Sequence, residues 1–358
     1  MAIRVAIVAD DLTGALDTGT PFVEAGLSVA VALDVGAIEA TIATGAEVVV
    51  VNTVSRALDP LQAADRVRQA TAALCRPSPE FVLKKIDSRL KGNVAAESAA
   101  LALAFGRHRL AVAPAVPDQR RYTREAHVVG FGIAEPLPIA PLFSGPALDV
   151  EIADAASDED LDGIVESLDW SLTIAVGARG LGRALARRLA RHASPTPFEP
   201  SERTLFAFGS RDPITEAQMA VLLESDLIAS HCNAPAGDVP ADGDPARLPM
   251  LLRCTGALTD PSEIVAKRFA KGVSRIVAAT MPDMLMMGGG DTAYAILRSL
   301  GAGVLLPKSE IEAGIPWFET VRPNGGRMRC AVKSGGFGNA QSLLKVLQDA
   351  PDLRYVGR

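Results

Sequence analysis

The chain has 358 residues, of which 48% are hydrophobic and 22% are charged, and its net charge is -6. These values are ordinary for a globular protein of roughly two domains, each long enough to bury a core. The acidic balance argues against nucleic acid as a partner, and no apolar run has the length of a membrane span. We expect a cytoplasmic protein without a signal peptide. Four cysteines and four histidines are scattered without metal-ligand spacing, so no metal site is expected.

Short apolar segments alternate with helical patterns from the start of the chain. We predict strands at residues 3–9, 28–33, 46–51, 81–84, 110–113 and 172–176, and helices at 61–74, 94–105 and 158–168. Residues 127–132 are expected to be irregular. Such alternation predicts a parallel sheet with helices on both faces. The prolines of residues 193–200 predict a linker, which separates an N-terminal domain at 1–195 from a C-terminal domain at 201–358.

Charged and hydroxyl-bearing residues follow most of these first-half strands. In a parallel sheet the carboxyl ends share one edge, where α/β proteins bind ligands. Arginine suits a carboxylate and aspartate suits a hydroxyl, so the mixture predicts a site for a small hydroxylated acid. Any one of these residues could instead form a structural ion pair, and either adjacent aspartate could simply cap the next helix. The candidates are Asp10, Asp11, Ser55, Arg56, Lys85, Asp87, Ser88, Arg89 and Arg121.

Glycine-rich loops mark the second half. Gly288 to Ala293 precedes a helix-like segment at 293–300, and Lys333 to Asn339 precedes another at 340–347. A further helix is predicted at about 262–271, and Gly209-Ser210 follows the strand predicted at 204–208. Glycine lets backbone N–H groups approach a phosphate closely, and a helix N-terminus favours its charge. We therefore predict a nucleotide site here, although Asp291 or Thr292 could cap the helix without any ligand.

Taken in order, these motifs resemble the four-carbon acid sugar kinase family along almost the whole chain. The resemblance rests on residues 8–19, 84–93, 114–123 with 127–130, Gly209-Ser210, 289–293 and 333–338. The chain is shorter than the family pattern, and two loops depart from it. Arg89 and Lys91 replace the Thr and Arg of Asp-Ser-Thr-Leu-Arg-Gly-Asn, and Arg120-Arg121-Tyr122-Thr123 stands where the family has Gly-Arg-Thr-Thr.

The resemblance implies an α/β protein of two domains, each a mostly parallel sheet flanked by helices, with the active site in the cleft between them. The implied reaction transfers phosphate from Mg²⁺-bound ATP to the terminal hydroxyl of threonate, erythronate or a 3-oxo-tetronate. A carboxylate would deprotonate that hydroxyl, with Asp11 or Asp10 as the first choice and Asp291 as the rival. The acid would contact Asp10, Asp11, Arg56, Lys85, Asp87, Ser88 and Arg121, and ATP would contact Ser210, Gly289, Gly290, Asp291, Thr292 and Gly335.

Other readings stay open at this point. The changed acid-side loops suit a non-catalytic nucleotide or sugar-acid binding protein, or a kinase for another small hydroxy acid. An α/β oxidoreductase or phosphatase is disfavoured, because the chain lacks G-x-G-x-x-G, the Walker pattern and a nucleophile elbow. The sequence does not decide the oligomeric state, for which a homodimer is one option.

Overall fold

The computed structural model describes residues 3–76, 78–143, 148–192, 195–240, 246–257, 259–321 and 325–348. The chain divides into two compact units: Met1–Pro195 with Gly303–Pro307, and Thr196–Ala302 with Lys308–Arg358. Each unit contains mostly parallel strands flanked by helices, as the sequence predicts. Of the predicted linker, residues 193 and 194 lie outside the described residues.

In the first unit, the described residues form seven parallel strands. Their apolar, largely β-branched sequences suit burial on both faces, which is the environment of parallel strands. At one side, Val304 and Leu305 of β15 (Val304–Glu312) add an antiparallel strand to β2. The spatial order of the seven is β2 (Val29–Ala32), β3 (Val48–Asn52), β1 (Val5–Ala9), β4 (Phe81–Lys85), β10 (Thr173–Gly177), β5 (Arg109–Ala113) and β9 (Asp149–Ile152).

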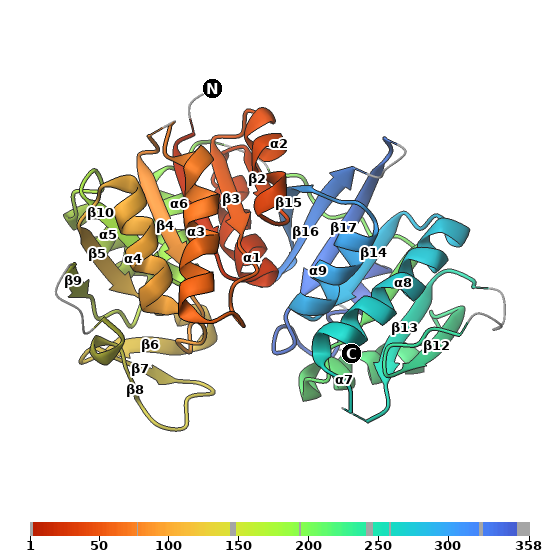
Figure 1. The fold of residues 1–358 in the computed structure, drawn as a ribbon. Coiled ribbons are helices and arrows are strands. Elements are labelled where there is room, and N and C mark those ends of the chain that lie inside the picture. Colours follow the sequence, from red (N-terminus) through yellow and green to blue (C-terminus); the bar gives the residue numbers. More distant parts are fainter. Residues whose placement is uncertain are drawn as a thin grey trace. The chain divides into compact units, whose positions relative to one another are not determined.

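Helices cover both faces of this sheet (Figure 1). On one face, α2 (Ile38–Ala43), α3 (Pro60–Leu74) and α4 (Val94–Phe105) pack over a core that includes Val8, Val49 and Val82. On the other, α1 (Leu12–Glu24) contacts α6 (Arg179–Arg188), which also contacts α5 (Asp158–Ser167). Side chains supply the caps at several starts: Asp11 caps α1, Asp59 caps α3, and Ser157 with Asp160 forms a capping box on α5.

A small antiparallel sheet of β6 (Arg121–Arg124), β7 (His127–Gly130) and β8 (Leu137–Pro138) follows β5. The prediction that residues 127–132 are irregular is therefore wrong for 127–130. Two glycines at its turns have positive φ, Gly130 at 107° and Gly132 at 74°. Because these torsions disrupt the period-2 pattern, the strand is hard to see in the sequence.

The second unit repeats the architecture. Its parallel strands are β12 (Ser230–Pro235), β13 (Met250–Thr255), β11 (Thr204–Phe208), β14 (Met284–Gly288) and β17 (Arg327–Lys333), in that order, with β16 (Ile315–Val321) antiparallel on β17. Met219 and Leu222 of α7 (Pro213–Glu224) pack with Phe206 and Phe208 on one face. The neighbouring helices α8 (Ser262–Thr280) and α9 (Gly290–Ser299) lie side by side (Figure 1).

Two helix predictions in this unit need correction. The helix predicted at 262–271 continues to Thr280, because residues 274–280 keep a helical period of apolar positions. No α-helix forms at 340–347, where the described residues make turns and a 3-10 helix at Leu344–Val346. The hydroxyl of Ser342 there accepts a hydrogen bond from the Asn339 amide, a local contact that competes with helix formation.

Both units have a topological switch point. From β1 the chain crosses towards β2, whereas from β4 it crosses towards β5 on the other side. In the second unit the chain leaves β11 towards β12 and leaves β14 towards β16 and β17. In open α/β sheets, ligands usually bind outside the carboxyl ends of the two strands at such a switch point. None of the described helices has the length and apolarity to cross a membrane.

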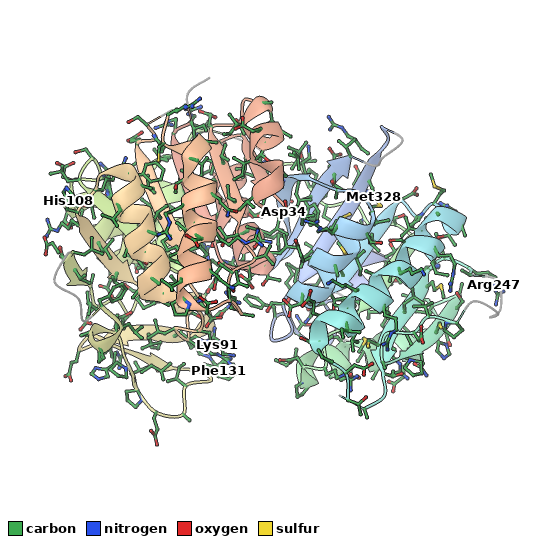
Figure 2. The ribbon with its side chains drawn as sticks, viewed as in Figure 1. Asp34, Lys91, His108, Phe131, Arg247 and Met328 are labelled. Carbon is green, nitrogen blue, oxygen red and sulfur yellow. The ribbon has the colours of Figure 1, made fainter. Side chains whose placement is uncertain are left out.

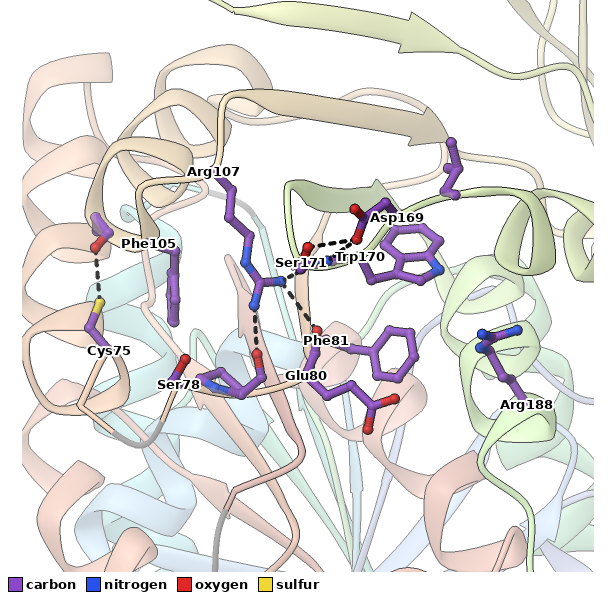
Figure 3. Close-up of a pocket in the computed structure, with 13 residues that line it drawn as sticks. Cys75, Ser78, Glu80, Phe81, Phe105, Arg107, Asp169, Trp170, Ser171 and Arg188 are labelled. Carbon is purple, nitrogen blue, oxygen red and sulfur yellow. Dashed lines mark hydrogen bonds between the residues drawn. The ribbon is translucent and has the colours of Figure 1, made fainter.

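The opposite edge of the first sheet contains a cavity of about 580 Å³. In Figure 2, His108, just before β5, marks this edge, whereas Lys91 and Phe131 lie at the other edge. Buried Arg107 lines the cavity (Figure 3) and donates to the Trp170 carbonyl at 2.7 Å and the Pro79 carbonyl at 2.6 Å. Burial lowers the pKa of Arg107, while Asp169 acts the other way. Because its Nη1 and Nη2 atoms donate to backbone carbonyls, Arg107 holds these loops together and is not placed to bind a ligand.

We expect Arg107→Met to lower the free energy of unfolding of the first unit by about 2–4 kcal/mol, because it leaves buried carbonyls unsatisfied. Urea unfolding followed by Trp170 fluorescence in a Trp317→Phe background measures this unit. The matched control Arg188→Met changes an exposed side chain of the same cavity and should cost less than about 0.5 kcal/mol. Equal stability of the two variants would show that Arg107 does not hold these loops.

Candidate functional site

Arg56 is the centre of a charged cluster at the carboxyl edge of the first sheet. Its Nε and Nη2 atoms donate to the two carboxylate oxygens of Asp10, both at 2.8 Å. Its Nη1 donates to Asp11 Oδ2 at 2.8 Å and lies 3.8 Å from Asp87 Oδ2. One guanidinium thus binds two carboxylates from the loop after β1 and lies within ion-pair distance of a third from the loop after β4, and these two strands flank the switch point.

Strand register and backbone hydrogen bonds place these residues together. Ala9, the last residue of β1, pairs with Asn52 of β3 and Lys85 of β4, so the three strands end at one level. The Ser55 and Arg56 amides both donate to the Asp10 carbonyl, at 3.1 and 3.3 Å. The loop after β3 is thereby fastened to the loop after β1, which aims Arg56 back at the aspartates.

Asp10 is 3% exposed, and burial alone would raise its pKa. The positive charges of Lys84, Arg56 and Lys85 outweigh that effect and hold the Asp10 pKa below its ordinary value. Asp10 is therefore an ionised carboxylate whose two oxygens already accept from Arg56. Asp11 is more accessible, with 18% of its side chain exposed.

Asp11 also caps α1, as one alternative from the sequence proposed. Its Oδ1 accepts from the Gly14 amide at 2.9 Å and its Oδ2 from the Thr13 hydroxyl at 2.7 Å. A Cβ atom at Gly14 would lie 2.5 Å from Asp11 Oδ1 and 2.9 Å from Lys85 Nζ. The ammonium of Lys85, which donates to the Ile86 carbonyl at 2.8 Å, and the carboxylate of Asp11 therefore both lie close to Gly14, and only glycine leaves room for them.

Ser88 and Arg121 form the next part of the same edge. Arg121 Nη1 donates to Ser88 Oγ at 2.9 Å and to Gln119 Oε1 at 2.6 Å. The Asp87 Oδ1 atom accepts from the Arg89 amide at 2.7 Å, which folds this loop back towards Arg56. The structure thus brings together the predicted acid-side residues Asp10, Asp11, Arg56, Lys85, Asp87, Ser88 and Arg121.

A buried ion pair behind Asp10 was missed by the sequence reasoning. Lys84 Nζ lies 2.6 Å from Glu97 Oε2, and each side chain is 1% exposed. Glu97 Oε1 accepts from the Ser55 hydroxyl at 2.9 Å, and Ser55 Oγ lies 2.6 Å from Thr53 Oγ1. The sequence does contain a signal for this pair. Lys84 interrupts an apolar strand and Glu97 interrupts an apolar helix, and charges that are buried in this way require partners.

In the second unit, three glycine-containing loops meet at one sheet edge. The Gly209 amide donates to the Gly288 carbonyl at 3.0 Å, and the Gly289 amide donates to the Lys333 carbonyl at 3.0 Å. A Cβ atom at Gly209 would lie 2.0 Å from Thr292 Oγ1, and one at Gly335 would lie 2.8 Å from Ser210 Oγ. The loops after β11, β14 and β17 therefore adjoin, and with them all the predicted nucleotide contacts: Ser210, Gly289, Gly290, Asp291, Thr292 and Gly335.

Helix α9 begins at Gly290, and its N-cap is Gly289 with φ of 97° and no side-chain cap. The alternative that Asp291 or Thr292 caps this helix is therefore wrong. Both residues lie inside the first turn, where Asp291 is exposed and Thr292 buried. A helix that starts in glycine without a capping side chain leaves its first N–H groups for an anion.

Lys333 supports the third loop from below. Its fully buried Nζ donates to Thr215 Oγ1 at 2.9 Å and to the Ser334 and Gly335 carbonyls at 3.1 and 2.8 Å. Burial lowers the pKa of Lys333 to about 8, although Asp212 and Glu312 act in the opposite direction. A positive charge that titrates near neutral pH thus lies beneath the Ser334-Gly335 turn.

Comparison with known proteins assigns both halves. Residues 5–137 match the model of a sugar-binding N-terminal domain, and residues 251–343 match that of a nucleotide-binding C-terminal domain. The D-threonate kinases of Bordetella bronchiseptica and Cupriavidus necator are each 28% identical; the alignments cover 98% and 97% of this chain and 98% of each relative. The 3-oxo-tetronate kinase of Methylobacterium radiotolerans is 27% identical over 97% of this chain and 99% of its own.

The chain belongs to the four-carbon acid sugar kinase family. It is accordingly a phosphotransferase with an alcohol group as acceptor, which sets aside the oxidoreductase and phosphatase readings. The alignment to the Bordetella kinase runs over 408 residues, more than the 358 of this chain, so that relative carries segments that are absent here. A solved Salmonella typhimurium structure shares the fold, with a TM-score of 0.75 at 17% identity over 98% of this chain and 100% of its own.

For this member of the kinase family, we expect nucleotide affinity to fall as the pH rises through about 8. A polyanion binds the protonated form of Lys333 better, and that form is lost above its pKa. Calorimetric titration of ATP between pH 7 and pH 9 should show the decline, whereas Lys333→Gln should give a flatter profile. The control Lys267→Gln, at an exposed lysine of α8, should keep the decline. An unchanged profile in Lys333→Gln would exclude Lys333 as its source.

Proposed function

We propose that this chain is an ATP-dependent kinase for the terminal hydroxyl of a four-carbon sugar acid of the threonate, erythronate or 3-oxo-tetronate type. The main support is that each unit has a distinctive set of loops at its topological switch point. In the first unit these loops cluster carboxylates around Arg56, and in the second unit three glycine-containing loops adjoin. The first suits a polyhydroxy acceptor and the second a polyphosphate. The names of the relatives support the acceptor class, and the nucleotide-binding domain supports ATP as the donor.

On the donor side, the ATP phosphates would bind backbone N–H groups at Gly289, Gly290 and Gly335, with hydroxyls from Ser210 and Thr292. The unfilled N-terminus of α9 supports this placement. Among the residues that the structure describes, no group of three or more acidic, histidine or cysteine side chains is arranged to hold a metal. Magnesium would therefore arrive with the nucleotide, held mainly by phosphates and water, and would neutralise phosphate charge.

On the acceptor side, Asp11 is the better candidate for the general base. Asp10 is more deeply buried, and Arg56 binds both of its carboxylate oxygens. Asp11 is more exposed, and its carboxylate and the Lys85 ammonium both lie close to Gly14. Asp291, in the first turn of α9, remains the rival base. Lys85, Asp87, Ser88 and Arg121 would bind the hydroxyls and the carboxylate of the acid.

A coupled ADP-release assay with Mg-ATP tests the proposal against threonate, erythronate, 3-oxo-tetronates and longer or branched sugar acids. Turnover of a four-carbon acid above the others is the expected result. Turnover only of another acid would support the alternative of a kinase with a different hydroxy acid as substrate. ATP binding without turnover of any acid would support a non-catalytic binding protein.

Asp11→Asn should reduce kcat by about 10²- to 10⁴-fold, because the amide cannot accept the hydroxyl proton. Asparagine caps helices as well as aspartate does, so α1 should stay folded and the loss can be assigned to the base. The control Asp65→Asn, on the exposed face of α3, should keep kcat. If Asp11→Asn retained kcat while Asp291→Asn lost it, the base would be Asp291.

A further inference from the structure

Beyond Asp87, the acceptor edge carries a second guanidinium group, that of Arg89, beside Arg121, and the proposed reaction has not yet given Arg89 a role. Arg56 is neutralised by Asp10 and Asp11. For Arg89 and Arg121, by contrast, no carboxylate in the described parts of the chain lies within the 4.0 Å of an ion pair. The charges of Asp87 and Asp118 act on Arg121 only from beyond that distance.

The hydrogen-bond partners of Arg121 in the described parts of the chain are all neutral. Its Nε donates to the Phe131 carbonyl at 3.0 Å, and its Nη1 donates to Ser88 Oγ and Gln119 Oε1. These contacts come from the loop after β4, the turn before β6 and the end of β7. The guanidinium is thus oriented before any ligand arrives, although it forms no ion pair with the described residues.

Arg89 reaches the same place from the loop after β4. A Cβ atom at Gly132 would lie only 2.9 Å from Arg89 Nη2, so this exposed side chain rests against the turn after β7. Burial and the nearby charge of Arg89 lower the pKa of Arg121, while Asp87 and Asp118 act the other way. Two like charges at one edge repel, and an anion between them would relieve that repulsion.

We propose that Arg89 and Arg121 form a paired-guanidinium site for the anionic end of the acceptor, with Arg89 as a specificity-determining residue. The inference rests on the proposed function and deepens it. A planar carboxylate matches the fork of donors on each guanidinium. The site selects hydroxy acids with a terminal carboxylate over neutral polyols of the same length, and it places the carboxylate away from the Asp11 end.

Steady-state kinetics of Arg89→Gln, with the acid that the wild type turns over best, tests this site. The KM for the acid should rise roughly tenfold or more, because the substitution removes one charged hydrogen-bonding partner of the carboxylate. The kcat and the KM for ATP should change less than about twofold, because the interaction is equal in the ground and transition states. Arg89→Lys should recover part of the affinity, since it restores charge without the fork.

Arg124→Gln is the matched control. Arg124 is also an exposed arginine of this region, but it lies over the Tyr122 ring at 5.3 Å. Its removal should leave all three constants unchanged, and the preference for the acid over the neutral polyol should fall only in Arg89→Gln.

The outcomes separate the two proposals. Wild-type turnover of an acid with an unchanged KM in Arg89→Gln overturns the paired-guanidinium site and leaves the kinase proposal intact. A loss of kcat at constant KM also overturns it, because Arg89 would then act on the transition state. If the wild type neither binds acids by calorimetry nor turns them over, the proposed function fails, and this site fails with it.

Discussion

The bidentate bond between Arg56 and Asp10 is the interaction on which the first unit's functional edge depends. Burying the Asp10 carboxylate, which is 3% exposed, would cost much free energy without a partner. Arg56 supplies two hydrogen bonds and the opposite charge. The surroundings are fitted to this pair. The Asp10 carbonyl accepts the Ser55 and Arg56 amides, and a Cβ atom at Gly92 would lie 2.9 Å from Asp10 Oδ2. Behind it, Lys84 and Glu97 compensate each other, so the buried charges at this edge come in matched sets.

The two units share one strand topology but present opposite electrostatic character at the carboxyl ends of their strands. The orders β2-β3-β1-β4 and β12-β13-β11-β14 are the same pattern, and in each the switch point lies between the first and the fourth strand in chain order. In the first unit those loops carry Asp10, Asp11 and Asp87, which suit hydroxyl groups. In the second they carry Gly209, Gly289 and Gly290, whose N–H groups suit phosphate. The fold therefore supplies position, and the loop residues supply chemistry.

The architecture and the polar edge could be predicted because both depend on local signals. Strands and helices follow from apolar period, and the residues after parallel strands must share an edge, which is why Asp10 and Lys85 were found. The features that could not be predicted from the sequence depend on contacts between distant residues. The partner of Lys84 is Glu97 in the next helix, and α9 starts one residue after Gly289 because that glycine takes φ of 97°. Residues 340–347 have helical propensity, but a local hydrogen bond from the Asn339 amide to Ser342 prevails there.

The hydrogen bonds of Arg56 and Arg121 also indicate how the proposed acid substrate would be oriented along this edge. Arg56 donates three bonds to its own aspartates, so its charge is already compensated and its attraction for another anion is weak. Its effect is to orient carboxylates, which are acceptors for hydroxyl groups. Among the described residues, Arg121 donates to neutral oxygens, so its guanidinium can still form an ion pair with a ligand. An acid bound along this edge is therefore expected to point its hydroxyl end at Asp10 and Asp11 and its carboxylate at Arg121, which is the polarity that phosphorylation of a terminal hydroxyl requires.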